Sequence, residues 1–83
     1  MSLTVVVQET ALRALACIRS EDKEVFAAIR QALSALADQP RPDQAIAWGG
    51  SGIYRLHLPG VRILYEIDDS VATVYIINVA RTA

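Results

Sequence analysis

The last third of the sequence constrains the fold most, because it consists of three strand-like segments separated by tight turns. Residues 53–58 and residues 61–67 both alternate in polarity, which is the period of a half-buried strand. A Pro-Gly pair separates these two segments, and an Asp-Asp-Ser run separates the second from the long apolar segment 71–79. Consecutive strands joined by such turns predict an antiparallel meander.

The alternation also assigns the side chains of this meander to two faces. One face is apolar and is expected to cover the core; it carries Tyr54, Leu56, Leu58, Ile63, Tyr65 and Ile67. The opposite face carries Arg55, His57, Arg62, Leu64 and Glu66. Since only one face is apolar enough to be buried, the second is predicted to meet water or a partner.

The first half of the chain predicts a short strand and two helices. The β-branched run at residues 3–7 is typical of a strand. Apolar residues at helical spacing, Leu12, Leu15 and Ala16, predict a first helix that ends at Ile18. The acidic residues that follow would place negative charge at the positive end of a second helix.

The second helix has a clearer apolar stripe than the first. Its core residues recur at three- and four-residue steps: Phe26, Ile29, Leu33 and Leu36. Pro40 and Pro42 end this helix, because proline disfavours helix both at its own position and before it. Residues 39–52 are then expected to form a linker that ends in a glycine-rich run. Two helices separated by so few residues should pack as a hairpin.

Together these segments predict a single domain, residues 1–83, of the α+β class. Their order is β-α-α-β-β-β, with the helical hairpin packed on one face of an antiparallel sheet. Apolar residues make up 53% of the 83 residues, so part of the apolar surface should stay exposed and attract a partner. We therefore expect the chain to self-associate, for example as a homodimer, unless a partner covers that surface.

Cysteine content, hydropathy and charge limit the environment of the protein. No segment reaches the roughly 20 apolar residues of a membrane-spanning helix, and the N-terminus lacks the pattern of a signal peptide. The one cysteine, Cys17, cannot form an internal disulfide, fits a reducing cytoplasm and is expected to be buried or half-buried in its helix. The net charge of −1 counts against tight RNA binding through charge alone. Residues 1–3 are compatible with a cloning remnant.

The strands and the end of the second helix carry a recognisable pattern. Residues 52–56 read Gly-Ile-Tyr-Arg-Leu, and residues 61–69 read Val-Arg-Ile-Leu-Tyr-Glu-Ile-Asp-Asp. Ahead of them, residues 33–42 contain two leucines at helical spacing followed by Pro-Arg-Pro. These segments resemble the RelE/ParE toxins of type II toxin–antitoxin pairs, in which a strand of the form YRLR precedes YRVIYEID. The β-α-α-β-β-β order is similar to that family's fold along the whole chain.

The resemblance implies a function and a set of residues. RelE-like members cut messenger RNA in the ribosomal A site, by attack of a ribose 2′-OH on the adjacent phosphate. The positions that match the family's functional basic residues are the candidate catalytic residues Arg55, His57, Arg62 and Arg81. Arg41, Arg55, Arg62 and Arg81 are the candidate RNA-binding residues, because a guanidinium can hold two phosphate oxygens. The implied partners are a cognate antitoxin, the ribosome and mRNA.

Two features depart from the RelE pattern and leave other functions open. RelE-like nucleases carry a C-terminal Tyr or His that moves the proton, whereas this sequence ends at Ala83, and Thr82 replaces the second residue of a basic pair. The imidazole of His57 could take over this role, since imidazoles ordinarily titrate near neutral pH. Cleavage is therefore expected to be weak. The alternatives are a ParE-like toxin that inhibits DNA gyrase without catalysis, and an inactive member that acts as a binding partner.

Several of these residues also have a purely structural explanation. Arg62 could pair with Glu66 on the same strand face, and His57 could be an ordinary exposed strand residue. The tyrosines of the apolar face are assigned to packing. Trp48 could stack on a base but is expected to cover the edge of the core. One His and one Cys, far apart in the sequence, make no metal site, and no glycine-rich loop precedes a helix, so no cofactor is expected.

Overall fold

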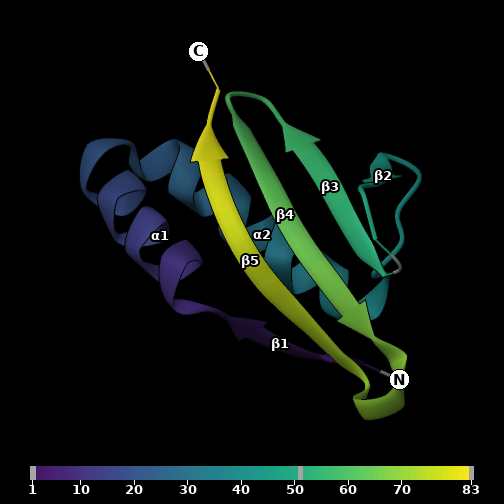
Figure 1. Cartoon of the computed structure of the whole chain (residues 1–83). Helices are drawn as coiled ribbons and strands as arrows, with labels where there is room; N and C mark the ends of the chain where they lie inside the picture. The colour runs from purple at the N-terminus through teal and green to yellow at the C-terminus, as the bar shows by residue number, and fades with distance from the viewer. Residues whose placement is uncertain (1, 51, 83) are drawn as a thin grey trace.

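The computed structural model describes residues 2–50 and 52–82, which form a sheet with two helices on one face (Figure 1). The strands are β1 (Thr4–Val7), β2 (Ala45–Ala47), β3 (Ile53–Leu58), β4 (Val61–Asp68) and β5 (Thr73–Arg81). The helices are α1 (Glu9–Glu21) and α2 (Lys23–Asp38), and a 3-10 turn (Asp69–Val71) joins β4 to β5. The strand order in the sheet is β1-β5-β4-β3-β2. The predicted α+β class, the helical hairpin and the meander β3-β4-β5 are thus confirmed.

The sheet is mixed, so the prediction of an antiparallel sheet was wrong at one edge. β1 pairs with β5 in parallel, with Val5 opposite Val74. The helical hairpin returns the chain to the end of the sheet where β1 began, so β3 runs in the same direction as β1. Two further reversals then leave β5 parallel to β1. Parallel neighbours need a long crossover connection, and the hairpin with the strands after it provides one.

The predicted linker contains a strand that sequence patterning missed. Residues 45–47 form β2 and pair antiparallel with β3, with Ile46 opposite Arg55. Three residues are too few to show an alternation, so no pattern in the sequence distinguishes this strand from a loop. β2 covers only part of the edge of β3, and its chain continues into the glycine-rich run that precedes β3.

A single residue, Asp22, separates the two helices. Its backbone N–H donates to the carbonyl of Ile18 at 2.7 Å and closes α1. Its side chain accepts from the backbone N–H of Val25 at 3.1 Å and caps α2. Aspartate is among the best residues for this position, because its carboxylate satisfies an unpaired amide and its charge opposes the helix dipole. The expected acidic start of the second helix therefore lies at Asp22, and α1 extends beyond the predicted end.

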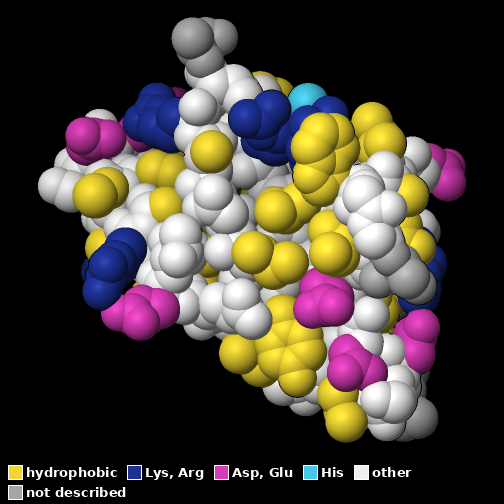
Figure 2. Space-filling view, in the orientation of Figure 1, with side chains coloured by type: hydrophobic (Ala, Val, Ile, Leu, Met, Phe, Trp, Pro, Cys, Tyr) yellow, Lys and Arg dark blue, Asp and Glu magenta, His cyan; other side chains and the backbone are white. Residues whose placement is uncertain are grey.

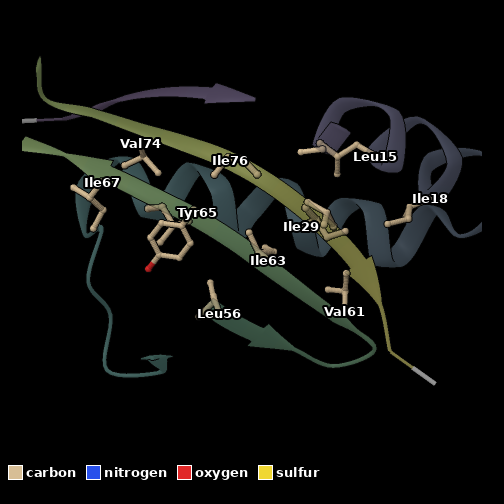
Figure 3. Packing of buried hydrophobic residues seen from close by; sticks show 13 residues of the cluster. Leu15, Ile18, Ile29, Leu56, Val61, Ile63, Tyr65, Ile67, Val74 and Ile76 are labelled. Carbon is tan, nitrogen blue, oxygen red and sulfur yellow. The ribbon is translucent and has the colours of Figure 1, made fainter. Parts of the chain in front are cut away.

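The core lies between the helices and the apolar face of the sheet (Figure 3). The helices contribute Ala11, Leu15, Ile18, Ile29 and Leu36, and the strands contribute Leu56, Val61, Ile63, Tyr65, Ile67, Val74, Ile76 and Val79. The predicted apolar face of β3 and β4 and the predicted stripe of α2 are confirmed. Burial of this apolar surface is the main term that stabilises a domain of this size.

The apolar stripe predicted for α1 lies one residue too far along the chain. Ala11 and Leu15 face the core, whereas Leu12 is 58% exposed and Cys17 is also exposed, contrary to expectation. The sequence of α1 is apolar on more than one side, so two stripes fit the helical period equally well. Packing against the sheet selects one of them.

β5 contains an irregularity that changes which face its residues occupy. Leu64 lies opposite Asn78 while Tyr65 lies opposite Ile76, so Ile77 is one extra residue in β5. Such a bulge shifts the alternation by one residue. Ile76 before the bulge and Val79 after it are therefore both buried against the helices.

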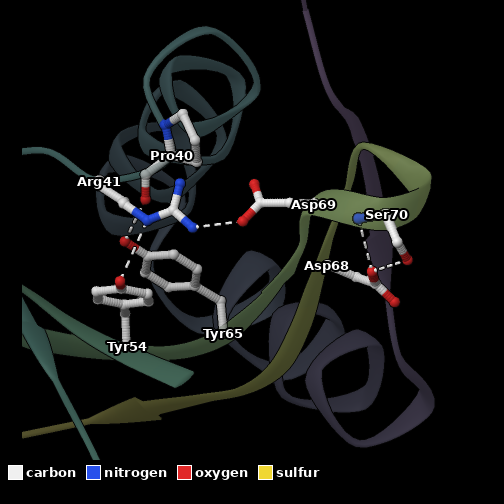
Figure 4. A network of polar contacts seen from close by, with 7 residues as sticks. All are labelled: Pro40, Arg41, Tyr54, Tyr65, Asp68, Asp69 and Ser70. Atoms are coloured by element: carbon white, nitrogen blue, oxygen red, sulfur yellow. Dashed lines mark hydrogen bonds and ion pairs between the residues drawn. The ribbon is translucent and has the colours of Figure 1, made fainter. Parts of the chain in front are cut away.

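A polar network joins the end of α2 to the strands (Figure 4). The hydroxyl of Tyr65 donates to the carbonyl of Pro40 at 2.8 Å. Arg41 donates to the hydroxyl of Tyr54 at 3.2 Å and to a carboxylate oxygen of Asp69 at 2.9 Å, and these hydrogen bonds raise the pKa of Arg41. The rings of Tyr54 and Tyr65 stack with their centroids 5.8 Å apart. The prediction that these two tyrosines serve packing is confirmed.

Burial, with a smaller contribution from Tyr54, raises the pKa of Tyr65 to about 12, and this predicts an alkaline loss of stability. In the unfolded chain the same phenol loses its proton near its ordinary pKa of 10.0. The contribution of Tyr65 is therefore complete below pH ~10 and is lost as pH rises toward ~12. We expect this loss to reach at most about 3 kcal/mol, measured by urea unfolding between pH 9 and pH 12. Tyr65→Phe should remove the loss and Tyr75→Phe should keep it; an unchanged alkaline slope in Tyr65→Phe would contradict the assignment.

Candidate functional site

The face of the sheet opposite the helices is open and carries a groove (Figure 2). The groove has a volume of about 350 Å³ and crosses β3, β4 and β5. Its lining consists of Trp48, Arg55, Arg62, Leu64, Asn78 and Ala80. In Figure 2, Lys and Arg side chains gather toward the end of the sheet where β3 turns into β4, whereas acidic side chains lie over its other end and at the margins of the molecule. The face predicted to meet water or a partner thus carries a basic groove.

Strand register brings three of the predicted site residues together. His57 on β3 lies directly opposite Arg62 on β4, and Arg55 lies opposite Leu64. Arg55 and Arg62 are therefore diagonal neighbours on one face, within reach of long side chains. Both arginines line the groove, whereas His57 is exposed beside Arg62 and does not line it. The sequence placed these three residues on one face, and the structure confirms that placement.

Trp48 lies on the open face, which corrects the prediction that it covers the core. The residue is 47% exposed. The guanidinium carbon of Arg55 lies 4.0 Å from the centre of the indole ring, a distance at which a cation interacts with an aromatic face. The backbone N–H of Trp48 donates to the carbonyl of Ile53 at 2.8 Å and fixes the start of the loop between β2 and β3. The Nε of Arg55 is buried and has no hydrogen-bond partner.

Among the residues that the structure describes, no carboxylate forms an ion pair with the arginines of the groove. Within residues 2–50 and 52–82, ion pairs join Arg13 to Glu9 at 2.6 Å, Arg41 to Asp69 at 2.9 Å and Arg81 to Asp22 at 3.4 Å. The alternative pairing of Arg62 with Glu66 is not among these pairs. Positive charge is therefore uncompensated at Arg55 and Arg62, even though the chain as a whole has a net charge of −1. The net charge counted against RNA binding, but the local charge of this face is positive and can attract a phosphate backbone.

The other two predicted basic residues lie away from the groove. Arg81 follows Val79 on the helix side of the sheet, because the bulge at Ile77 shifts the end of β5 by one residue. There it bonds to the carboxylate of Asp22 at the helix junction. Arg41 is held by its hydrogen bonds at the end of α2. The structure therefore does not bring Arg41 or Arg81 together with the arginines of the groove.

The contact between Asp22 and Arg81 leads to a stability prediction. Asp22→Ala should lower the free energy of unfolding by about 1–2 kcal/mol, because the amide of Val25 loses its cap. Asp22→Asn keeps a cap acceptor and loses mainly the partly exposed ion pair with Arg81, so its cost should stay below about 1 kcal/mol. Urea unfolding of the two variants distinguishes these contributions. Equal losses in both variants would show that the ion pair, not the cap, stabilises the junction.

Sequence reasoning missed one polar residue of the groove, Asn78. It lies next to the bulge, where its side-chain oxygen accepts from the backbone N–H of Val79 at 2.9 Å. Its position within an otherwise apolar stretch of β5 is a signal that could have identified it. Ala80 is small and leaves room above the sheet beside Arg62, its neighbour in the register.

In the described part of the chain, no three His, Cys, Asp or Glu side chains lie close enough to hold a metal ion. No described helix has the length and apolar character needed to cross a membrane.

Comparisons with known proteins place this geometry in a family. A family model described as the ParE toxin of the type II toxin–antitoxin system parDE matches residues 5–83. No curated protein sequence matches the chain. Among solved structures, the toxin–antitoxin complex RelBE2 from Mycobacterium tuberculosis matches with a TM-score of 0.82 and 26% identity, covering 99% of this chain and 100% of that chain.

Two further solved structures show the same fold at lower identity. The isolated RelE toxin of E. coli matches with a TM-score of 0.84 and 21% identity, covering 99% of this chain and 86% of that chain. The archaeal RelE–RelB complex from Pyrococcus horikoshii matches with a TM-score of 0.84 and 21% identity, covering 98% of this chain and 96% of that chain. The chain therefore belongs to the ParE toxin family of type II toxin–antitoxin systems, within the RelE/ParE superfamily that its sequence pattern resembled.

Proposed function

We propose that this toxin acts as a RelE-like, ribosome-dependent mRNA endoribonuclease that inhibits translation. The observation that carries the proposal is the pair of uncompensated arginines, Arg55 and Arg62, in one groove beside His57. A groove with this charge fits an RNA backbone better than a neutral peptide. The exposed indole of Trp48 in the same groove adds a surface on which a base can stack.

The chemistry of RNA cleavage requires two roles that these residues can fill. The ribose 2′ oxygen forms a bond to the adjacent phosphorus while the bond from phosphorus to the 5′ oxygen breaks, which leaves a cyclic phosphate. Negative charge develops on the phosphoryl oxygens, and Arg62, with Arg55, would stabilise it. A proton must leave the 2′-OH and another must reach the 5′ oxygen. His57 is the neighbouring group suited to proton transfer, and it is exposed to a ligand that enters from the open face.

A second candidate is ParE-like inhibition of DNA gyrase by binding, without catalysis. Two observations favour it: the family model is described as a ParE toxin, and Arg81 bonds to Asp22 instead of lining the groove. A third candidate, a catalytically inactive member that serves as a binding partner, shares the same fold. Under both, the groove would bind a partner without cutting it.

A paired assay distinguishes these functions. The purified toxin is added to ribosomes programmed with mRNA, and A-site cleavage is measured by primer extension. The same preparation is added to gyrase with supercoiled DNA, and DNA cleavage and supercoiling are measured. RNA cleavage without an effect on gyrase is the expected result. An effect on gyrase alone would replace the first proposal with the second, and no effect in either assay would favour the inactive member.

A cognate antitoxin is the expected protein partner. The solved relatives include toxin–antitoxin complexes from Mycobacterium tuberculosis and Pyrococcus horikoshii. By this likeness we infer that an antitoxin binds the present chain and holds it inactive. The exposed apolar side chains of the open face, which include Val6 and Ile46, would then lose contact with water.

A further inference from the structure

Trp48 has a position that packing of the fold does not require. It is the one tryptophan of the chain, the residue is 47% exposed, and it lies on the open face instead of in the core. Large aromatic side chains contribute most to stability when they are buried. An indole held in the open beside a basic groove therefore points to a ligand that covers it.

Neighbouring groups hold Trp48 in place but leave part of its side chain exposed to solvent. The guanidinium of Arg55 lies against one face of the ring at 4.0 Å, so the exposed surface belongs mainly to the other face and the ring edge. The hydrogen bond from its backbone to Ile53 positions the residue at the end of β2. A Cβ atom placed on the next residue, Gly49, would contact nothing within 4 Å, so the space at this position is open. One face of the indole thus packs against Arg55, and the other face is open to solvent.

We infer that Trp48, supported by Arg55, forms a stacking subsite for an unpaired nucleobase, next to a phosphate site at Arg62. This inference rests on the proposed function and assigns a residue to the recognition of single-stranded RNA. Every base has an aromatic face, so stacking on an indole binds single strands with little sequence preference. The groove of about 350 Å³ is large enough for a small ligand, and both Trp48 and Arg62 line it. One nucleotide can therefore place its base on Trp48 and its phosphate near Arg62.

The unpaired Nε of Arg55 supports this arrangement. Within the described part of the chain it is the one buried side-chain nitrogen or oxygen that lacks a hydrogen-bond partner. Polar groups in this state cost free energy, and bound water or ligand atoms commonly satisfy them. Because Nε is buried, a nucleotide oxygen can accept this hydrogen bond only after the Arg55 side chain shifts within the groove.

The test compares two short RNAs of equal length. One is a single strand with 2′-O-methyl sugars at each position, so that it cannot be cleaved, and the other has the same backbone without bases. Their binding is measured by fluorescence anisotropy of a dye on the oligonucleotide. Trp48→Ala is expected to weaken binding of the base-containing strand about tenfold or more and to leave the abasic strand unchanged. Trp48→Phe should recover part of the affinity, and Leu12→Ala, an exposed apolar residue of α1, is the matched control.

Emission of the single tryptophan provides a second readout on the unmodified protein. The base-containing strand should quench Trp48, and the abasic strand should not. Equal affinities of the wild type and Trp48→Ala for the base-containing strand would overturn the subsite and leave the proposed function intact. Equal losses with both strands would show that Trp48 only holds Arg55, which would also overturn stacking. If the wild type binds neither strand, the subsite is overturned, while the proposed function is decided separately by the assay on programmed ribosomes.

Discussion

Replacing Arg62 with alanine is expected to lower toxic activity about 100- to 1,000-fold while leaving the fold intact. This range is typical for the loss of one charged donor that stabilises a developing negative charge. Arg62 fits that role because it lines the groove, lies opposite His57 and has no carboxylate partner within residues 2–50 and 52–82. Its side chain projects from the open face, so its loss should change the free energy of unfolding by only about 0.5 kcal/mol.

The measurement combines single-turnover mRNA cleavage on programmed ribosomes with urea unfolding of the same preparations. Arg62→Lys keeps the charge but not the planar fork, so its activity should be intermediate. Arg30→Ala is the matched control, because it removes one exposed arginine from the helix side of the molecule. Full activity in a folded Arg62→Ala variant would remove Arg62 from the site. Equal losses in Arg62→Ala and Arg30→Ala would indicate that only overall charge matters.

The parts of the fold that the sequence predicted are those with a repeated local pattern. The alternation in β3 and β4 separated the buried tyrosines from Arg55, His57 and Arg62, because a strand has a strict period of two. The apolar stripe of α2 was equally clear. In contrast, the direction of β1 relative to β5 depends on the number of chain reversals between them, and β2 is too short to show any period. These features arise from tertiary pairing, which no local window contains.

The candidate site was predicted in part, and its errors have specific physical causes. Arg81 was grouped with the groove arginines, but one extra residue at Ile77 moves it to the helix side. A bulge leaves little signal in an apolar strand, so the sequence could not reveal this change. Trp48 was assigned to the core because exposed tryptophans are uncommon. Its position depends on pairing of β2 with β3, which the sequence did not predict.

His57 is expected to have the second large effect on activity, because RNA cleavage needs proton transfer as well as charge stabilisation. The register places His57 opposite Arg62, so a phosphate held by that arginine lies near the imidazole. The loss of a positioned acid or base typically lowers a rate 10²- to 10⁴-fold. The side chain is exposed, so its removal should leave stability nearly unchanged.

We therefore expect His57→Ala to lower single-turnover cleavage about 10²- to 10⁴-fold and added imidazole to restore part of it. The restoration is the informative result: imidazole can move a proton in the vacated space but cannot replace a positioning contact. It should not restore Arg62→Ala, because that variant lacks charge stabilisation instead of proton transfer. His57→Gln, which keeps polar size but does not titrate, should be as inactive as His57→Ala. Robust cleavage by His57→Ala without imidazole would contradict the assignment and leave Arg55 and Arg62 to act through positioning and charge alone.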